Sequence, residues 1–299
     1  MTYVLSLIAA KSKAALTEDH VTRAAAEIQR AGGQAIAPTW LGEGEAAEIC
    51  FEGERDPVLE QARALFSELP VDVNMLPTSH RRKKLLVADM DSTMIQQECI
   101  DELAAELGLG EKVSAITERA MRGEIAFEPA LRERVALLAG LAGDTVERIL
   151  AERIVLMPGG ATLIKTVRAN GAYTALVSGG FTAFAGPISR KIGFDEFRAN
   201  ELLFEGAAFS GLVAEPILGR DAKKTTLLEL TERFALEPEE TIAVGDGAND
   251  LAMVEGAGLG IAYHAKAALK AAASAILDHA DLTGILYLQG YRRNEFVDA

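Results

Sequence analysis

Two aspartates separated by one residue, Asp89 and Asp91, directly follow the apolar run Leu85-Leu-Val-Ala88. Such a short run is typical of a strand buried on both faces of a parallel sheet, and these sheets bind ligands at the carboxyl ends of their strands. Two carboxylates this close repel each other unless a cation or a proton compensates the charge, and oxygen ligands suit magnesium. On this motif alone a second interpretation stays open, in which Asp91 or Ser92 only caps the next helix.

A second acidic cluster follows another apolar run, in the sequence Gly245-Asp-Gly-Ala-Asn-Asp250. The glycines allow the backbone to turn tightly around a bound ion. We expect Asp246 to complete a metal site with Asp89, and Asp250 to hold a metal-bound water from behind. Without the first cluster, an ordinary turn between a strand and a helix would explain this motif.

A third element, Val177-Ser178-Gly179-Gly180, places a hydroxyl and glycine amides between a predicted strand and a predicted helix. That arrangement suits an anion, although a plain glycine turn explains it equally well by itself. Lys223, at the opening of a helix predicted over 224–230, offers a positive charge for a phosphoryl group. A lone lysine at such a position is more often a surface residue. The chain lacks a GxxxxGK[ST] motif, so nucleotide binding is not indicated.

The composition excludes several other classes of protein. With 30 Lys and Arg against 44 Asp and Glu, the formal charge is -14, which repels nucleic acid and anionic lipid, so we expect neither as a partner. Cys50 and Cys99 show no CxxC spacing, which argues against a disulfide framework or a zinc site and favours the cytoplasm. The four histidines are scattered, and no GxSxG motif or membrane-length apolar run occurs.

The chain length of 299 residues suggests roughly two domains. In the first part, strand-like and helical patterns alternate as strand, helix, strand, strand, helix, strand, which predicts a small ferredoxin-like α+β domain. The polar, basic segment 77–84 indicates a linker, and we expect its basic side chains to be solvated, as is usual for such runs. We therefore expect one domain over 1–78 and a second over 79–299. The predicted strands of the first domain are 3–8, 34–41, 46–51 and 71–75, and its predicted helices are 18–31 and 57–69.

In the second domain the apolar periodicity of residues 95–155 is helical throughout. From Pro158 onward helices alternate with the predicted strands 173–177, 241–244 and 258–262, which predicts a parallel sheet covered by helices. The segment 197–212 is expected to form a β-hairpin or flap. The fold class is therefore α/β for the second domain.

The motifs DMDST, VSGG and GDGAND, with Lys223 before the last, closely resemble the haloacid dehalogenase superfamily and its phosphoserine phosphatase branch over residues 84–290. The resemblance implies a Rossmann-like sheet with a helical cap, about 95–155, inserted after the first catalytic strand. It implies that Asp89 is a nucleophile that forms an aspartyl-phosphate and that Asp91 acts as general acid and then general base. The implied ligands of Mg²⁺ are Asp89, the Asp91 carbonyl and Asp246, and the implied phosphate-binding residues are Ser178, Gly179, Lys223 and Asn249.

The resemblance also implies a substrate. In the cap, Glu98 would meet the ammonium group of phosphoserine and Arg134 its carboxylate, while Met121 and Phe127 would shield the pocket. The implied reaction is hydrolysis of O-phospho-L-serine to L-serine and phosphate, the last step of serine biosynthesis. The alternatives are another small phosphomonoester such as phosphohomoserine, transfer of the phosphoryl group to an alcohol, and a regulator with an inactive phosphatase half.

The first domain resembles the ACT-like amino-acid-sensing domains in the order of its elements. Two interpretations stay open for it. It could bind an amino acid such as serine, or it could be a spacer or a homodimerisation module that binds nothing.

Overall fold

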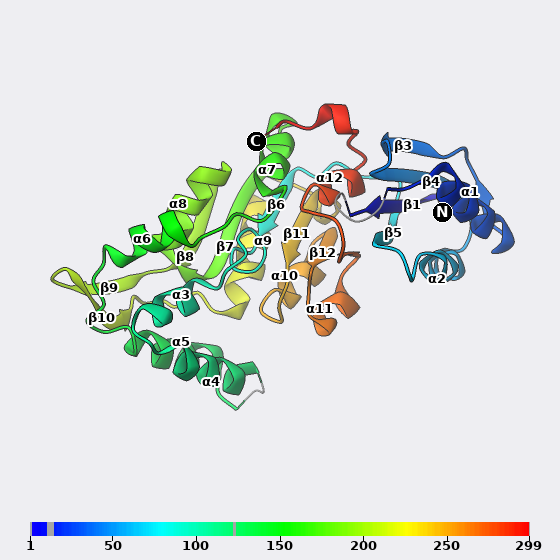
Figure 1. Cartoon of the computed structure of the whole chain (residues 1–299). Coiled ribbons are helices and arrows are strands. Elements are labelled where there is room, and N and C mark those ends of the chain that lie inside the picture. The colour runs from blue at the N-terminus through cyan, green and yellow to red at the C-terminus, as the bar shows by residue number, and fades with distance from the viewer. Residues whose placement is uncertain (1, 11–14, 122–123, 299) are drawn as a thin grey trace.

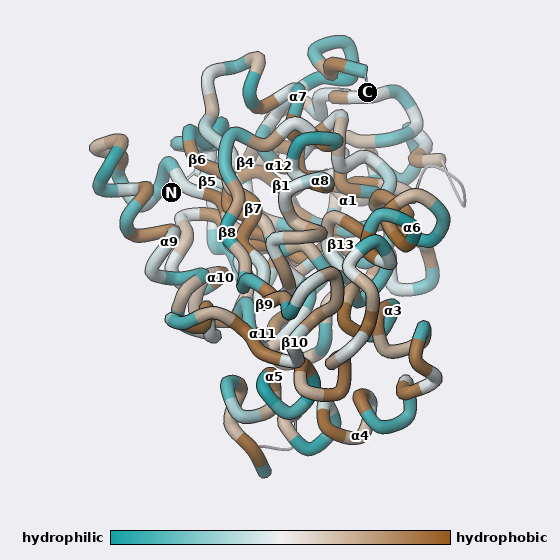
Figure 2. The backbone as a smooth tube through the Cα atoms, turned by 90° about the vertical axis from the view of Figure 1, so that its left-hand side faces the viewer, coloured by the Kyte–Doolittle hydropathy of each residue, from teal (hydrophilic) through white to brown (hydrophobic). Residues whose placement is uncertain are grey.

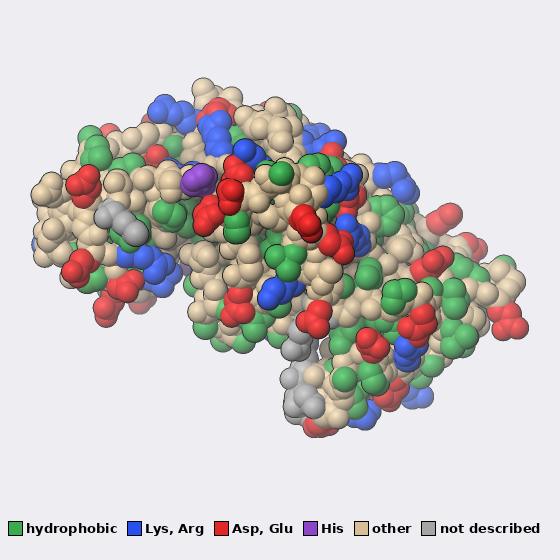
Figure 3. Space-filling model, turned by 180° about the vertical axis from the view of Figure 1, so that it is seen from behind, with side chains coloured by type: hydrophobic (Ala, Val, Ile, Leu, Met, Phe, Trp, Pro, Cys, Tyr) green, Lys and Arg blue, Asp and Glu red, His purple; other side chains and the backbone are tan. Residues whose placement is uncertain are grey.

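A computed structural model describes residues 2–10, 15–121 and 124–298, and for Met121 and Arg220 it describes the backbone alone. Figure 1 shows three parts: an N-terminal sheet with two helices (blue), a central parallel sheet, and a group of helices (green) beside that sheet. No helix among the described residues is long and apolar enough to cross a membrane. The face seen in Figure 3 carries acidic and basic side chains intermixed, without a large basic patch among the described residues.

The N-terminal part has the predicted ferredoxin-like order, with an antiparallel sheet arranged β2-β4-β1-β5 and β3 also paired with β4. Helices α1 and α2 cover one face of this sheet, and their buried residues include Val21, Ile28 and Leu59. The elements are β1 (Thr2–Ala9), α1 (Glu18–Arg30), β2 (Gln34–Ala35), β3 (Thr39–Gly42), β4 (Ala46–Glu52), α2 (Arg55–Leu65) and β5 (Val71–Pro77). The single strand predicted over 34–41 is wrong. It is split in two around Pro38, which has no amide hydrogen to donate to a neighbouring strand.

The other face of the N-terminal sheet packs against the rest of the chain, since Ile8 and Leu76 belong to the main hydrophobic core. The basic segment between the two parts is also packed. The guanidinium of Arg81 pairs with Glu48 at 2.6 Å and donates to the carbonyl of Leu288, and Lys83 is only 9% exposed. The expectation that this run is merely solvated is therefore wrong for these two side chains.

The central sheet is entirely parallel, in the order β13-β12-β11-β6-β7-β8, with apolar cores on both faces. In Figure 2 hydrophobic segments (brown) lie along the interior and hydrophilic ones (teal) along outer segments such as α6. The strands are β6 (Leu85–Ala88), β7 (Tyr173–Phe181), β8 (Glu196–Asn200), β11 (Thr241–Gly245), β12 (Leu259–Tyr263) and β13 (Ala275–Leu277). The helices are α7 (Gly160–Ala169), α8 (Thr182–Ile192), α9 (Arg220–Arg233), α10 (Leu251–Gly256), α11 (Ala267–Ala272) and α12 (Gly284–Leu288), with short 3-10 turns at Pro238–Glu240 and Arg293–Glu295.

Four helices are inserted between β6 and α7 and form the predicted cap: α3 (Cys99–Glu106), α4 (Gly110–Met121), α5 (Phe127–Ala136) and α6 (Thr145–Glu152). The chain enters and leaves the cap side by side, with an antiparallel bridge between Ile95 and Leu156. The hairpin of β9 (Leu202–Glu205) and β10 (Ala208–Val213) extends the cap, and the amide of Gly140 donates to the carbonyl of Phe209. The hairpin prediction for 197–212 is thus half right, because residues 197–200 belong to β8 in the central sheet.

Candidate active site

The three sequence motifs meet at one edge of the central sheet. Asp89 follows β6, Ser178 lies in β7 and Asp246 follows β11, and these strands are neighbours in the order β11-β6-β7. Because the strands are parallel, their carboxyl ends share one edge, which brings residues distant in sequence into one site.

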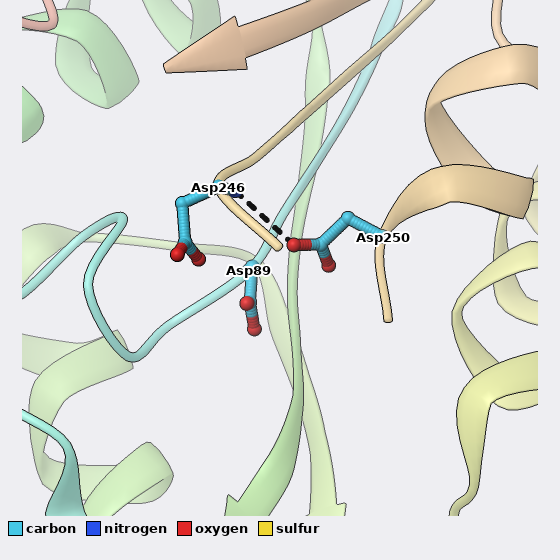
Figure 4. A group of neighbouring side chains, drawn as sticks. All are labelled: Asp89, Asp246 and Asp250. Atoms are coloured by element: carbon cyan, nitrogen blue, oxygen red, sulfur yellow. Dashed lines mark hydrogen bonds between the residues drawn. The ribbon is translucent and has the colours of Figure 1, made fainter. Parts of the chain in front are cut away.

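Three carboxylates form the centre of this site. Asp89, Asp246 and Asp250 each offer an oxygen, and these oxygens lie within 4.8 Å of one another. Figure 4 shows Asp250 on the α10 side, with its Oδ2 accepting the amide hydrogen of Asp246 at 3.1 Å. A Cβ atom on Gly245 would lie 2.3 Å from the Asp250 carboxyl carbon, so this approach requires glycine. The cluster has the donor chemistry that a hard divalent cation prefers.

Lys223 supplies the positive charge at this cluster. Its Nζ lies 2.6 Å from Asp89 Oδ1 and 2.5 Å from Asp250 Oδ1, with the side chain 4% exposed. Burial alone would lower the pKa of Lys223, but the carboxylates of Asp250 and Asp89 outweigh it and raise the pKa, so the ammonium stays protonated. The predicted helix start at residue 224 is wrong, since α9 begins at Arg220 and Lys223 lies within its first turn.

Burial also dominates the charge state of the acids. It raises the pKa of Asp89, with Asp250 adding to the effect and Lys223 opposing it. It raises the pKa of Asp246 to about 6, again with Asp250 as the next cause. Lys223 alone therefore cannot compensate the charge of three ionised carboxylates, and a bound divalent cation would supply the missing positive charge.

Asp91 lies beside the segment Ser178-Gly179-Gly180, which we call the glycine loop. A Cβ atom on Gly180 would come within 3.0 Å of both Asp91 Oδ2 and Ser178 Oγ, so two motifs touch here. The amide of Cys99 donates to Asp91 Oδ1 at 3.3 Å, and the Cys99 thiol also hydrogen-bonds to this carboxylate. Burial, followed by the nearby charge of Glu98, raises the pKa of Asp91 to about 7. An acid with this pKa can give up or take a proton near neutral pH.

The glycine loop is held from behind by a residue that sequence reasoning missed. Ser178 Oγ accepts the amide hydrogen of Gly180 at 2.8 Å. Asn200, which is 2% exposed, donates to the carbonyl of Gly179 at 2.9 Å and accepts from the amide of Leu218 at 2.7 Å. Its side chain thus fixes the loop to the segment that leads into α9. Ser178–Gly180 lie within β7, which runs beyond the predicted end at 177.

Two other contributions were missed. Cys99 contacts Asp91 from the first turn of α3, and the hydroxyl of Thr93 donates to Asp246 Oδ1 at 3.4 Å. Thr93 belongs to the DMDST motif, so its place in that motif was an available signal. Neither Cys99 nor Asn200 has such a signal, because each depends on chain segments that meet only after folding.

The cap side chains reach the site to different extents. The Phe127 ring lies over the glycine loop, with its Cζ 3.2 Å from where a Cβ on Gly179 would stand. Glu98 is exposed, and its Oε1 accepts from the Ser92 hydroxyl at 2.7 Å.

Arg134 is half-buried in α5. Its Nε donates to the Ala130 carbonyl at 3.2 Å and its Nη1 to Thr117 Oγ1 at 3.3 Å. Burial lowers the pKa of Arg134, while Asp101 and Glu98 oppose the shift, so Glu98 and Arg134 share one electrostatic neighbourhood. These contacts use two of the five guanidinium N–H groups, so hydrogens on Nη1 and Nη2 are left for an end-on, two-pronged grip on a carboxylate.

Two further predicted site residues, Asn249 and Met121, lie in the loop after β11 and at the end of α4. Asn249 is half-buried in the loop after β11, with its Oδ1 2.5 Å from where a Cβ on Gly247 would lie. Met121 ends α4, and its side chain lies outside the described residues. The structure therefore brings together Asp89, Asp91, Ser178, Gly179, Phe127, Lys223, Asp246 and Asp250.

One hollow lies away from these residues. It has a volume of about 500 Å³ and is lined by Lys84, Arg168, Tyr173 and Phe234, at the amino ends of β6 and β7. None of the motif residues borders it, so the site is identified by its chemistry and not by the size of a cavity.

A parallel sheet with strand-end aspartates, a buried lysine and an inserted helical cap defines a class of hydrolase. Residues 86–255 match the family model of the haloacid dehalogenase-like hydrolases, and the chain belongs to this family.

The similarity to individual proteins covers more of the chain than the family model does. A phosphoserine phosphatase from Archaeoglobus fulgidus is 42% identical over 237 residues, which are 78% of this chain and 69% of that protein. The solved structure of a probable phosphoserine phosphatase from Vibrio cholerae has a TM-score of 0.79 and 31% identity, covering 97% of this chain and 86% of its own. A structure described as a phospho-aspartyl intermediate analogue of phosphoserine phosphatase has a TM-score of 0.64 and 40% identity, covering 69% of this chain and 98% of its own.

Proposed function

We propose that this protein is a magnesium-dependent phosphatase that hydrolyses O-phospho-L-serine to L-serine and phosphate, the last step of serine biosynthesis. The observation that carries the proposal is the contact of Asp89 with Lys223 beside Asp246 and Asp91, at the carboxyl edge of the sheet. The similarity to phosphoserine phosphatases supports the choice of substrate.

Magnesium would be held by the carboxylates of Asp89 and Asp246 and by the backbone carbonyl of Asp91. Asp250 would support the site from behind, through its bonds to Lys223 and to the amides of Asp246 and Gly247. When bound, the ion supplies positive charge to the phosphoryl oxygens and favours the ionised form of the neighbouring acids.

The reaction has two halves. In the first, a carboxylate oxygen of Asp89 attacks phosphorus, the bond from phosphorus to the serine oxygen breaks, and Asp91 gives its proton to that oxygen. In the second, Asp91 takes a proton from water, the water oxygen attacks phosphorus, and the bond to Asp89 breaks to release phosphate. The pKa of about 7 suits Asp91 to both roles.

The remaining residues hold the substrate. Ser178, Gly179, Lys223 and Asn249 would bind the phosphoryl oxygens, since this chemistry needs mainly fixed positive charge and hydrogen-bond donors. Glu98 and Arg134 would bind the ammonium and carboxylate groups, and Phe127 and Met121 would close the pocket. The position of Phe127 over Gly179 supports this arrangement.

We further propose that the chain divides near residue 78 into an ACT-like domain and a catalytic domain. Homodimerisation through the first domain and binding of serine to it remain predictions. The cytoplasmic location also remains a prediction, which rests on the two free cysteines Cys50 and Cys99.

The substrate assignment is tested by comparing phosphoserine with p-nitrophenyl phosphate in Arg134→Lys. We expect the KM for phosphoserine to rise at least tenfold, because a bidentate partner of the carboxylate is lost, while turnover of the aryl phosphate changes little. Arg132→Lys is the matched control, since Arg132 lies in the same helix and pairs with the exposed Glu215. Wild-type turnover of phosphoserine no faster than of the aryl phosphate would refute the substrate while leaving the phosphatase intact.

A further inference from the structure

The N-terminal sheet docks onto the catalytic domain through a buried acid. Asp72, in β5, is 4% exposed, and its carboxylate accepts three consecutive backbone amides of the catalytic domain. The distances are 2.7 Å to the amide of Asp278, 3.2 Å to that of His279 and 2.8 Å to that of Ala280. A carboxylate with several amide donors fixes the turn that supplies them, because each donor would lose a charge-assisted hydrogen bond if the turn moved.

Asn74 lies two residues further along β5 and faces the same domain. Its Nδ2 donates to the carbonyl of Ile276 at 2.8 Å, and its Oδ1 accepts the amide of Ile276 at 2.8 Å. Ile276 is in β13, the last strand of the central sheet in the described part of the chain. The amide group of Asn74 therefore pairs with an edge strand as another strand would. We call Asp72 and Asn74 together the β5 clamp.

Backbone hydrogen bonds lead from the clamped segment to the active site. The carbonyl of Leu277, at the end of β13, accepts the amide of His264, and the amide of Lys266 donates to the carbonyl of Asp246 at 3.0 Å. A second connection runs through α11, because Lys270 pairs with the carboxylate of Asp278 at 2.7 Å. In Figure 1 β12 and α11, in orange, lie on the side of β11 that faces the N-terminal sheet.

We propose that Asp72 and Asn74 are positioning residues for the active-site loop 245–250, so that the N-terminal domain holds Asp246 in place through β13, residues 264–266 and α11. Neither residue touches the site, and both act through the segment that they fix. The proposal uses the proposed function only for the role of Asp246 in binding a cation. The loop can move only if the hydrogen bonds that connect β5, β13 and residues 264–266 to Asp246 also move.

Hydrogen–deuterium exchange of the metal-free full chain tests the proposal without substrate. We expect Asp72→Asn and Asn74→Ala to speed exchange roughly 2- to 30-fold at the amides of Asp246, Gly247 and Lys266, which are hydrogen-bonded in the wild-type structure. Calorimetric titration with Mg²⁺ should show weaker binding by a similar factor. If Asp72→Asn does not fold, both the exchange rates and the Mg²⁺ affinity are measured on Asn74→Ala alone.

Glu48→Gln is the matched control, because it breaks the ion pair with Arg81 at another point of the same interface and leaves the β5 clamp intact. We expect it to leave exchange in 245–250 close to wild type. Unchanged exchange in both clamp variants, or an equal increase in Glu48→Gln, would overturn the proposal. A failed substrate assignment would leave these readings unaffected, so the two ideas fail separately.

Discussion

Replacement of Lys223 by methionine is the sharpest perturbation of the site. The variant keeps the length and apolar character of the side chain but removes the ammonium that lies within 2.6 Å of both Asp89 and Asp250. Removing one partner from a buried pair leaves uncompensated charge and costs about 3–5 kcal/mol of folding free energy. We therefore expect the free energy of unfolding of the metal-free variant, measured by urea unfolding, to be lower than that of wild type by that amount.

The loss should depend on pH and on magnesium. Burial raises the pKa of Asp246 to about 6, above its unfolded value of about 3.9, so its ionisation destabilises the fold as pH rises from about 4 to about 6. Without Lys223 the nearby acids should hold their protons more strongly, so the deficit of the variant should shrink as pH falls below 6. Saturating Mg²⁺ should stabilise the variant more than wild type, because the ion replaces the missing positive charge.

Turnover should fall as well, by roughly 10²- to 10⁴-fold at saturating Mg²⁺, since a fixed positive charge at the transferring phosphoryl group is removed. Lys224→Met is the matched control, because Lys224 is the next residue and is exposed. Urea unfolding at pH 5 and 7.5, with and without Mg²⁺, gives the stability values. A loss below about 1 kcal/mol at pH 7.5, or turnover equal to that of Lys224→Met, would refute the electrostatic reasoning.

Two further predictions concern other ionisable groups. Burial lowers the pKa of Lys83 to about 8, below its unfolded value of about 10.5, so its charge destabilises the fold below pH 8 and this penalty disappears as pH rises to about 10.5. Lys83→Met should therefore raise the free energy of unfolding at pH 7 by up to about 3 kcal/mol, reduced by about 1 kcal/mol for the lost hydrogen bond to the Glu239 carbonyl. Near pH 11 we expect no gain. A lower free energy of unfolding at pH 7, measured by thermal or urea unfolding, would contradict this prediction. Asp91→Asn should slow phosphoserine turnover about 10²- to 10⁴-fold, yet it should still release a burst of p-nitrophenol from p-nitrophenyl phosphate, because that leaving group needs no proton. Rapid-mixing absorbance measures the burst. Absence of the burst would show that Asp91 is needed for the attack of Asp89 on phosphorus itself, and not only for proton transfer to the leaving group.

The sequence predicts those parts of the site that lie on one continuous motif. Asp89 and Asp246 each follow an apolar run, and parallel strands must bring their carboxyl ends to one edge, so their meeting follows from local patterns. Lys223 was one candidate from its position, the family resemblance assigned it to phosphate binding, and its pairing with both Asp89 and Asp250 became visible only in the structure.

The parts that were missed depend on tertiary contacts. Asn200 ends a strand whose neighbours are set by the sheet order, and Cys99 reaches Asp91 only because the cap folds back over β6. The packing of Arg81 and Lys83 was mispredicted for the same reason. A run of basic residues indicates solvent exposure until a second domain covers it, and no local pattern shows that Glu48 lies opposite Arg81.

The central claim is that Asp89 forms a covalent bond to phosphorus. Acid quenching of the Asp91→Asn variant during turnover of p-nitrophenyl phosphate, whose leaving group needs no proton, followed by borohydride reduction and peptide mass spectrometry, identifies the modified residue directly. We expect the reduced acyl-phosphate at Asp89, within the peptide that spans β6 and the DMDST motif, and none in Asp89→Asn. A modified residue elsewhere, or sustained turnover of Asp89→Asn, would contradict the account.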